Sequence, residues 1–292
     1  MGGGRDTALV LGGGGLTGVG WESGILCGLA RAGADLSRAD LVVGTSAGSL
    51  VGAQLTSGLL TPEELYESQL GDGSGEAVAR FGAGLVARYA LAMARSRDAT
   101  AYRRRVGAMA LAAAGGADES ERREVLAARL VSHEWPERRL VVTAVDALSG
   151  ELAAFDRESG AGLVDAVSAS CAVPGVWPPV TVGQRRFIDG GIRSATNADL
   201  AAGYARVVII APMTLGSGLV PSPAARAARL RAARGAGAAD HAVPGGPQDL
   251  RAQRAGPGPA GPRGPGRARA GRGARRRGRR GLVRPGGLTM EG

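Results

Sequence analysis

Twice within the first fifty residues, a short apolar run ends in a glycine-containing turn and is followed by helical spacing of apolar side chains. The first run covers residues 7–11 and meets the glycines at 12–15, and the second covers residues 41–43 and stops at Gly44. Short apolar runs bounded by turn residues are typical of buried strands, and strands that alternate with helices predict a parallel sheet covered on both faces. Further apolar runs of strand length lie at residues 140–145, 152–155 and 207–211.

The glycine-rich loop at residues 13–18 satisfies the pattern G-x-G-x-x-G, for which three functions compete. A Walker A phosphate loop needs a lysine after its last glycine, and the chain contains no lysine. A dinucleotide site needs an acidic residue at the end of the second strand, whereas Asp40 stands at the beginning of that strand. The third function is an oxyanion hole, in which the backbone N–H groups of Gly13, Gly14 and Gly15 bind a developing negative charge beside a helix N-terminus.

The second turn reads Gly44-Thr45-Ser46-Ala47-Gly48, which is the G-x-S-x-G pattern of a nucleophile elbow in the strand–turn–helix context that this pattern requires. The turn holds its serine in a strained conformation, and the small neighbours Gly44 and Gly48 relieve the crowding. Ser46 would lie at a helix N-terminus, where negative charge is stabilised. The elbow favours the oxyanion-hole interpretation of the first loop and makes Ser46 the candidate nucleophile.

A serine nucleophile needs a base, and neither of the two histidines is a dependable partner. His133 lies in a polar segment typical of the surface, and His241 lies in the arginine-rich C-terminal segment. The candidate is Asp189, which ends an apolar run and precedes Gly190 and Gly191, although a plain turn aspartate fits the same pattern. Because the ordinary pKa of aspartate is about 3.9, a base at this position needs a dry site that raises its pKa.

The excess positive charge is confined to the C-terminal segment. Residues 1–224 have a formal balance of −3 and residues 225–292 a balance of +13. From residue 245 onward the chain is mainly Gly, Pro, Ala and Arg, and no aromatic residue follows Tyr204. We therefore predict a globular domain at 1–224 and a disordered tail at 225–292, which could be the product of a shifted reading frame, solvated disorder or a polyanion-binding arm. Nucleic acid is not the expected partner, because the tail lacks aromatic residues for stacking on bases.

The remaining composition bounds the class of protein. The first residues lack the basic and apolar regions of a signal peptide, and no run of 18 apolar residues could cross a bilayer. The two cysteines, Cys27 and Cys171, have no metal-ligand spacing and are expected to pack in the core. These features lead us to expect a cytoplasmic protein.

Residues 77–113 combine apolar side chains with arginines at helical spacing. This pattern predicts one or two amphipathic helices with a basic face. Such helices either pack against the core with one solvated face, or act as a lid or lipid-surface element beside a site. The pattern alone leaves both interpretations open.

These motifs, in this order, resemble those of the patatin-like phospholipase family. The loop at 13–18 is similar to the family's oxyanion-hole motif, and residues 44–48 are similar to its nucleophile elbow. Residues 189–191, Asp-Gly-Gly, resemble its D-G-[GA] motif, which carries the base of a Ser–Asp dyad, and residues 168–175 resemble the segment before that aspartate. One position departs from the family pattern, since Thr17 stands where members usually carry Arg or Lys.

The resemblance covers roughly residues 5–215 and implies a three-layer α/β/α sandwich with a mainly parallel central sheet. It also implies a serine acyl hydrolase of phospholipase A, lysophospholipase or esterase type, without a metal or an organic cofactor. The expected partner is a phospholipid or another acyl ester, with peripheral contact to a membrane surface. The residues that the resemblance assigns are the catalytic pair Ser46 and Asp189, the oxyanion glycines Gly13, Gly14 and Gly15, and the supporting glycines Gly18, Gly44, Gly48, Gly190 and Gly191.

Two other functions remain compatible with the sequence. An acyltransferase could use the same Ser46–Asp189 pair and would differ only in the acceptor of the acyl group. A polyanion-binding protein could instead act through its arginine-rich tail.

Overall fold

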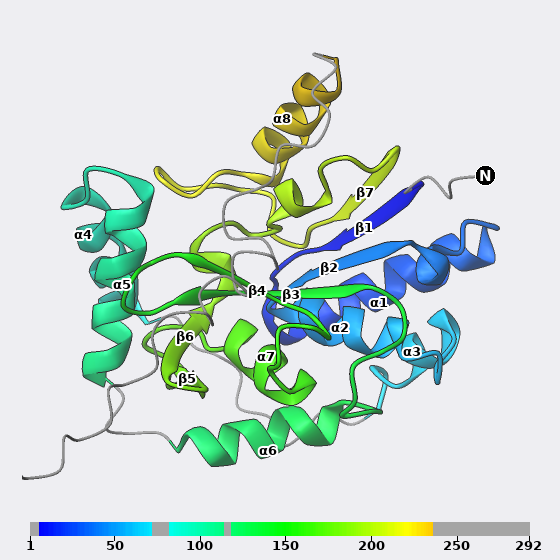
Figure 1. Cartoon of the computed structure of the whole chain (residues 1–292), viewed down its shortest axis with the longest axis horizontal. Coiled ribbons are helices and arrows are strands. Elements are labelled where there is room, and N and C mark those ends of the chain that lie inside the picture. The colour runs from blue at the N-terminus through cyan, green and yellow to red at the C-terminus, as the bar shows by residue number, and fades with distance from the viewer. Residues whose placement is uncertain (1–5, 72–81, 114–117, 236–292) are drawn as a thin grey trace, which may run out of the picture. The chain divides into compact units, whose positions relative to one another are not determined.

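The computed structural model describes residues 6–71, 82–113 and 118–235 of the chain. Its centre is a seven-stranded sheet in the order β5-β6-β3-β2-β1-β7, with β4 paired to β3 off this path (Figure 1). The strands are β1 (Thr7–Leu11), β2 (Leu41–Thr45), β3 (Leu140–Asp146), β4 (Leu152–Phe155), β5 (Val180–Val182), β6 (Arg185–Asp189) and β7 (Arg206–Ile210).

One half of the sheet is parallel and the other half is antiparallel. The β3-β2-β1-β7 half consists of parallel pairs, whereas β4 and β6 run antiparallel to β3, and β5 antiparallel to β6. Parallel strands are normally buried on both faces, and every residue of β2 and β3 is buried. The structure confirms the predicted strands, to within a few residues at their ends. These are the runs at 7–11, 41–43, 140–145, 152–155 and 207–211.

One edge of β3 is divided between two strands. Residues Val42 to Thr45 of β2 pair with β3 up to Thr143, and β6 takes over at Ala144, which pairs with Asp189. Because β4 pairs with β3 across both stretches, it must occupy the opposite edge, so β2 and β6 share one edge. The last residue of β2 and the last residue of β6 are therefore neighbours.

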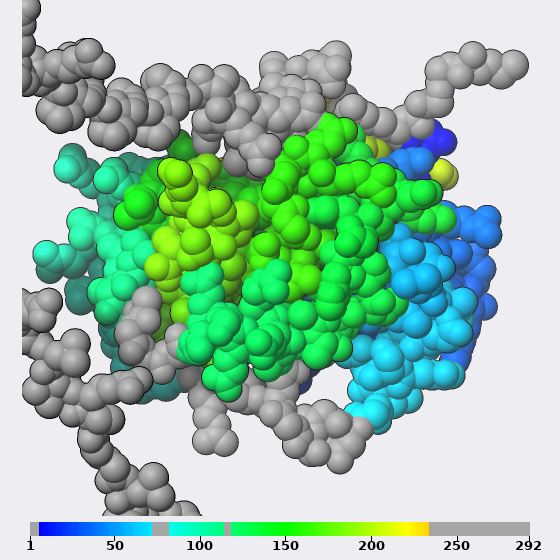
Figure 2. All heavy atoms as spheres, turned by 60° about the horizontal axis from the view of Figure 1, so that its bottom comes forward, coloured from blue at the N-terminus to red at the C-terminus, as the bar shows by residue number. Residues whose placement is uncertain are grey.

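Helices cover the first face of the sheet. They are α1 (Gly15–Arg31), α2 (Ala47–Thr56), α3 (Pro62–Glu67), α6 (Glu119–Arg129) and α7 (Leu163–Ser170). The alternate strand residues Leu9, Leu11 and Val42 point into the core that these helices form. All of α2 is buried, and α3 and α6 lie at the surface of this layer in the space-filling view (Figure 2).

The second face is covered by a separate set of elements, so the sheet is the middle of three layers. The other strand side chains, such as Val10 and Val43, pack against the short helix η3 (Ala198–Ala201) and Leu230 of α8 (Pro223–Gly235). Val145 packs against α5 (Ala99–Ala113), on which α4 (Ala83–Ala94) lies. This arrangement confirms the expected α/β/α fold with a mainly parallel central sheet, because five of the seven strands point in one direction and β4 and β6 point in the other.

Local signals in the sequence explain several helix ends. The predicted start of α3 is confirmed, because Thr61 and Glu64 form a reciprocal capping box ahead of Pro62. Helix α1 begins at Gly15, inside the G-x-G-x-x-G loop and several residues before the apolar spacing that indicated it. The amphipathic segment forms two helices, α4 and α5, and its residues 77–81 lie outside the described residues.

The C-terminal segment departs from its prediction at its beginning. Residues 225–235 were expected to belong to a disordered tail, but they continue α8. Alanine, arginine and leucine favour helices, and Arg226 is anchored by an ion pair to Asp199 at 3.1 Å. Residues 236–292, where the rest of the predicted tail falls, lie outside the described residues.

Within the described part of the chain, none of the helices combines the length and the apolar character that crossing a bilayer requires.

The docking of α5 on the sheet gives a prediction about stability. A Cβ atom at Gly107 would collide with the carbonyl oxygen of Ala147, whereas a Cβ at Gly28 of α1 would meet open space. We expect Gly107→Ala to lower the free energy of unfolding by about 1–3 kcal/mol through overpacking. The control Gly28→Ala should raise it by about 0.5–1 kcal/mol, since alanine favours a helix interior. Urea unfolding of both variants checks this, and equal effects would contradict the docking.

Candidate active site

Ser46 forms the sharp turn between β2 and α2, with φ 52° and ψ −119°. Positive φ in a non-glycine residue is strained and persists only where the surroundings enforce it. A Cβ at Gly48 would overlap the backbone of Leu11. A Cβ at Gly44 would lie 2.5 Å from the Cα of Ser49. The two flanking glycines thus allow the close packing that holds Ser46 in the strained turn.

Asp189 lies beside Ser46, because β2 and β6 meet on the shared edge of β3. The side chain of Ser46 interacts with the carboxyl of Asp189 and lowers its pKa, and the N–H of Gly191 donates to Oδ1 at 2.7 Å. Ser46 is 9% exposed and Asp189 is 5% exposed. Burial raises the pKa of Asp189 to about 6, and the hydrogen bond from Gly191 and the nearby Ser46 side chain oppose this rise.

The end of α7 and the residues that follow it hold the backbone of both residues. The N–H of Ser46 donates to Oγ of Ser170 at 2.8 Å, and the N–H of Asp189 donates to the carbonyl of Ala172 at 3.0 Å. The sequence indicated this segment only through its resemblance to the family and gave no role for Ser170. Its contacts fix the distance between the two candidate residues.

A buried asparagine joins the strands beneath the site. The Nδ2 of Asn197 lies 3.1 Å from Oγ1 of both Thr45 and Thr143, and 3.2 Å from the carbonyl of Gly190. Asn197 itself adopts positive φ, at 49°. Its side chain therefore connects the end of β2, the middle of β3 and the turn after Asp189. No motif pointed to Asn197, and the polar run at residues 194–197 was the only available signal.

The glycine loop runs beside Ser46, but its three leading glycines differ. Gly13 is buried, and its N–H donates to the carbonyl of Ala195 at 2.8 Å. Gly14 is half-buried and Gly15 is exposed, and within the described residues neither of their N–H groups has a hydrogen-bond acceptor. Gly13 is the loop residue in contact with Ser46, since a Cβ at Gly13 would lie 3.5 Å from the Cβ of Ser46, whereas the free N–H groups of Gly14 and Gly15 lie at the N-terminus of α1. A Cβ at Gly18 would lie 3.3 Å from Ala47, which sets the spacing between α1 and α2.

The buried carboxyl of Glu22 is hydrogen-bonded to Gly12, at the start of the glycine loop. Oε1 of Glu22 in α1 accepts a hydrogen bond from the N–H of Gly12 at 2.8 Å, and Oε2 is buried without a partner in the structure. Burial raises the pKa of Glu22 to about 9, against the effect of the Gly12 hydrogen bond. Glu22 is therefore protonated at neutral pH. The sequence did not indicate it as a site residue.

The histidines do not join this arrangement. His133 follows α6, is exposed, and its Nε2 lies 2.9 Å from the carbonyl of Ala127. His241 lies outside the described residues. Within residues 6–71, 82–113 and 118–235, no cluster of three or more His, Cys, Asp or Glu side chains could hold a metal ion.

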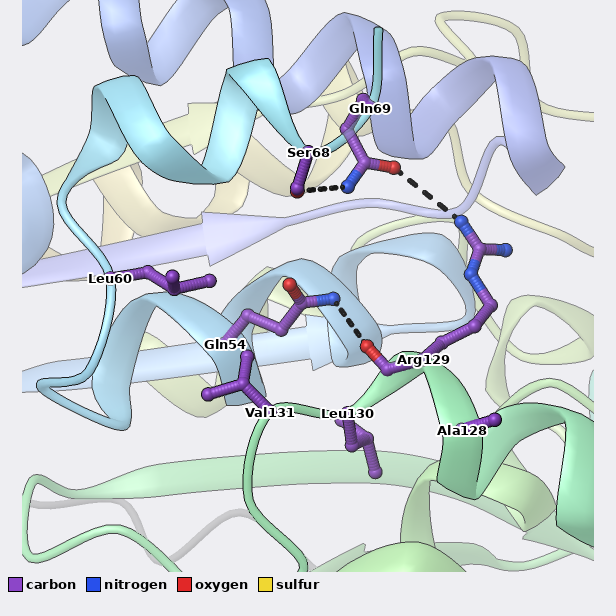
Figure 3. A pocket seen from close by; sticks show the side chains of 8 residues that line it. All are labelled: Gln54, Leu60, Ser68, Gln69, Ala128, Arg129, Leu130 and Val131. Carbon is purple, nitrogen blue, oxygen red and sulfur yellow. Dashed lines mark hydrogen bonds between the residues drawn. The ribbon is translucent and has the colours of Figure 1, made fainter. Parts of the chain in front are cut away.

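A pocket of about 370 Å³ lies at the other end of α2, away from Ser46 (Figure 3). Its polar groups are joined by hydrogen bonds: Nε2 of Gln54 donates to the backbone carbonyl of Arg129 at 3.1 Å, and the Arg129 side chain donates to Oε1 of Gln69 at 3.4 Å. The pocket thus connects α2 with the ends of α3 and α6. It is lined by Gln54, Leu60, Ser68, Gln69, Ala128, Arg129, Leu130 and Val131.

The fold and the site together define an α/β protein with a serine elbow, a glycine loop and a buried aspartate at adjoining strand ends. The sequence matches the family model described as patatin-like phospholipase over residues 9–202. The chain therefore belongs to the patatin-like phospholipase family. Membership supports a lipid acyl hydrolase activity in the broad sense.

Two solved structures are similar to this chain at low sequence identity. VipD from Legionella pneumophila is 15% identical, with a TM-score of 0.37, over 64% of this chain and 46% of VipD. The type III effector protein ExoU is 19% identical, with a TM-score of 0.34, over 78% of this chain and 51% of ExoU. The chain thus spans about half the length of these proteins. No curated protein matches it significantly.

The buried carboxyl of Glu22 predicts a pH-dependent difference in stability. The folded-state pKa of about 9 exceeds the ordinary value of 4.5, so the unfolded state releases the proton at lower pH than the folded state does. Glu22 therefore lowers the stability of the fold progressively as pH rises from about 4.5 to about 9, by about 1.4 kcal/mol for each pH unit.

Glu22→Gln removes this ionisation and keeps an acceptor for Gly12. We expect the variant to gain stability relative to wild type between pH 5 and pH 8, as measured by urea unfolding at both values. Groups that titrate in both proteins cancel in the comparison. A difference in unfolding free energy that is the same at both pH values would show that Glu22 ionises normally.

Proposed function

We propose that this protein is a serine acyl hydrolase that cleaves acyl esters of phospholipids, lysophospholipids or simpler lipids. The observation that carries the proposal is the placement of Ser46 and Asp189 together, both buried, at the meeting ends of β2 and β6, where Ser46 lowers the pKa of the Asp189 carboxyl. A serine in a strained turn at a helix N-terminus, in contact with a base of raised pKa, is the arrangement that an activated nucleophile requires. Family membership favours a lipid as the acyl donor.

In the first step, the Asp189 carboxylate accepts the hydroxyl proton while Oγ of Ser46 attacks the ester carbonyl carbon. The carbonyl electron pair moves to the oxygen, and we propose that the N–H groups of Gly14 and Gly15 stabilise this oxyanion together with the positive end of α1. Gly13 is a weaker candidate donor than the sequence implied, because its N–H already bonds to Ala195. Its part would be to hold the loop beside Ser46.

The second half of the reaction returns the enzyme to its starting state. The bond to the leaving alcohol breaks, and the alcohol takes the proton from Asp189, which leaves the acyl group as an ester on Ser46. Water then attacks the acyl carbon while Asp189 accepts one of its protons. The fatty acid departs, and Ser46 regains its proton.

Asp189 can act as this base because its environment raises its pKa without suppressing its ionisation at neutral pH. An ordinary aspartate is a weak base, whereas a carboxyl with a pKa of about 6 is both largely ionised at pH 7 and more basic. The side chain at Thr17 is uncharged and exposed, and its hydroxyl donates to the Gly14 carbonyl at 3.3 Å. Stabilisation of the oxyanion then depends on backbone groups and on α1.

Substitution of the pair tests the proposal. We expect Ser46→Ala and Asp189→Asn each to reduce hydrolysis of a short-chain nitrophenyl ester by about 10³-fold or more, since the two residues act as a unit. Ser57→Ala, at the other end of α2, should keep wild-type kcat/KM. Circular dichroism shows whether each variant is folded. Activity that survives Asp189→Asn would place the base elsewhere.

The raised pKa of Asp189 predicts the pH profile. Because the base must be ionised, kcat/KM should increase with pH, with a midpoint near pH 6, and should fall about tenfold for each pH unit below it. Rates are measured from pH 4.5 to 8, with Ser46→Ala as the blank at each pH. A midpoint near 4 would mean that Asp189 is not desolvated in the free enzyme.

A further inference from the structure

Helix α4 lies directly against the segment that holds the proposed dyad. Leu85 packs against Gly175, and the hydroxyl of Tyr89 donates to the carbonyl of Pro174 at 2.9 Å. Burial, together with the nearby charge of Asp189, raises the pKa of Tyr89. The inner face of α4 thus borders the site itself.

A loop continues this border from α4 to the glycine loop. At one end, the N–H of Leu219 donates to the sulfur of Met93 in α4 at 3.3 Å. At the other end, Pro212 packs closely against Gly14. Between these contacts the loop exposes apolar side chains, and Leu215 is 83% exposed. Exposed apolar side chains, Met213 and Leu215, therefore lie between α4 and the glycine loop.

The outer face of α4 is apolar and uncovered in the described part of the chain. At about 100° per residue, its outward side chains fill one continuous arc of about 140°. All of them are exposed, Val86 by 54% and Leu91 by 58%. We call this arc the α4 outer face, and it consists of Ala83, Val86, Ala87, Ala90, Leu91 and Ala94.

Arginines border this face on one side. Arg88 and Arg95 are exposed and follow Leu91 around the helix axis, and residues 83–95 contain no acidic side chain. An apolar arc flanked by arginines is typical of helices that lie in the interface of an anionic lipid layer. Figure 1 shows α4 outside α5, at the edge of the described part of the fold.

We propose that the α4 outer face docks on an anionic lipid surface and brings the proposed dyad to its substrate. The proposal rests on the proposed function and names the physical form of the substrate, an aggregated lipid rather than a dispersed one. Alanine, valine and leucine insert among acyl chains, while Arg88 and Arg95 bind headgroup phosphates. A protein partner fits the face less well, because it lacks the aromatic anchors that dominate protein interfaces.

Vesicle flotation of the full-length Ser46→Ala protein tests the docking without turnover of the lipid. The vesicles are phosphatidylcholine alone and phosphatidylcholine mixed with phosphatidylglycerol. We expect binding to the mixed vesicles, a loss of about tenfold or more in Val86→Asp/Leu91→Asp, and a loss of about tenfold in Arg88→Gln/Arg95→Gln. The matched control is Leu59→Asp/Leu70→Asp, which changes equally exposed leucines beside α3, at the far end of the view in Figure 1, and should bind normally.

A second readout separates this proposal from the proposed function. In protein with Ser46 intact, Val86→Asp/Leu91→Asp should hydrolyse a dispersed short-chain ester at the wild-type rate and vesicle phospholipid at least about tenfold more slowly. If vesicle binding depends on α4 but the protein has no esterase activity, the docking surface is supported and the proposed dyad is wrong. If the aspartate pair unfolds the protein, Val86→Ser/Leu91→Ser replaces it.

Two results would overturn the docking surface. The first is equal vesicle binding by the α4 variant and the Leu59/Leu70 control variant. The second is that the wild-type protein binds neither kind of vesicle and sediments as an oligomer, whereas Val86→Asp/Leu91→Asp sediments as a monomer. That outcome would assign the face to a second copy of the chain.

Discussion

The geometry of the site depends on the way that β2 and β6 divide one edge of β3. β2 runs parallel to β3 and ends at Thr45, level with Thr143, while β6 runs antiparallel and ends at Asp189, one position further along. Their C-terminal ends therefore face each other on the same edge, and the next residue after β2 is Ser46. A parallel β6 would have brought its other end to this point, so the antiparallel direction of this strand is what unites the pair.

This meeting point is stabilised by buried polar groups, and their surroundings decide their chemistry. Asn197 and Ser170 satisfy backbone and hydroxyl groups at the strand ends, which keeps the strained turn in place. Asp189 and Glu22 are both buried carboxyls, but two residues, Gly191 and Ser46, lower the pKa of Asp189, and one residue, Gly12, lowers that of Glu22. Burial accordingly raises the pKa of Asp189 only to about 6 and that of Glu22 to about 9. The Asp189 carboxyl is therefore largely ionised at pH 7, as the proposed base must be, whereas the Glu22 carboxyl stays neutral.

The elements around this centre connect it to the rest of the chain. Arg226 of α8 pairs with Asp199, which in turn binds Arg193, and Arg193 donates to the side chain of Asn197 at 2.7 Å. Helix α8 is therefore joined through side chains to the asparagine beneath the site, although composition assigned most of its residues to the tail. On the other side of the site, Leu85 and Tyr89 of α4 contact residues 174–175. Both helices are rich in alanine, and their contacts distinguish their roles.

The sequence by itself determined the local parts of this protein. The apolar runs predicted strands, the capping box predicted α3, and the spacing of Gly44 and Gly48 around Ser46 predicted the strained turn, because each of these signals acts between residues close in the chain. Tertiary structure alone decided that β6 runs antiparallel, that the Gly13 N–H is occupied by Ala195, and that Asn197 and Glu22 lie beneath the site. These features join residues that are distant in sequence, and burial, which sets the pKa of Asp189, exists only once the layers have packed.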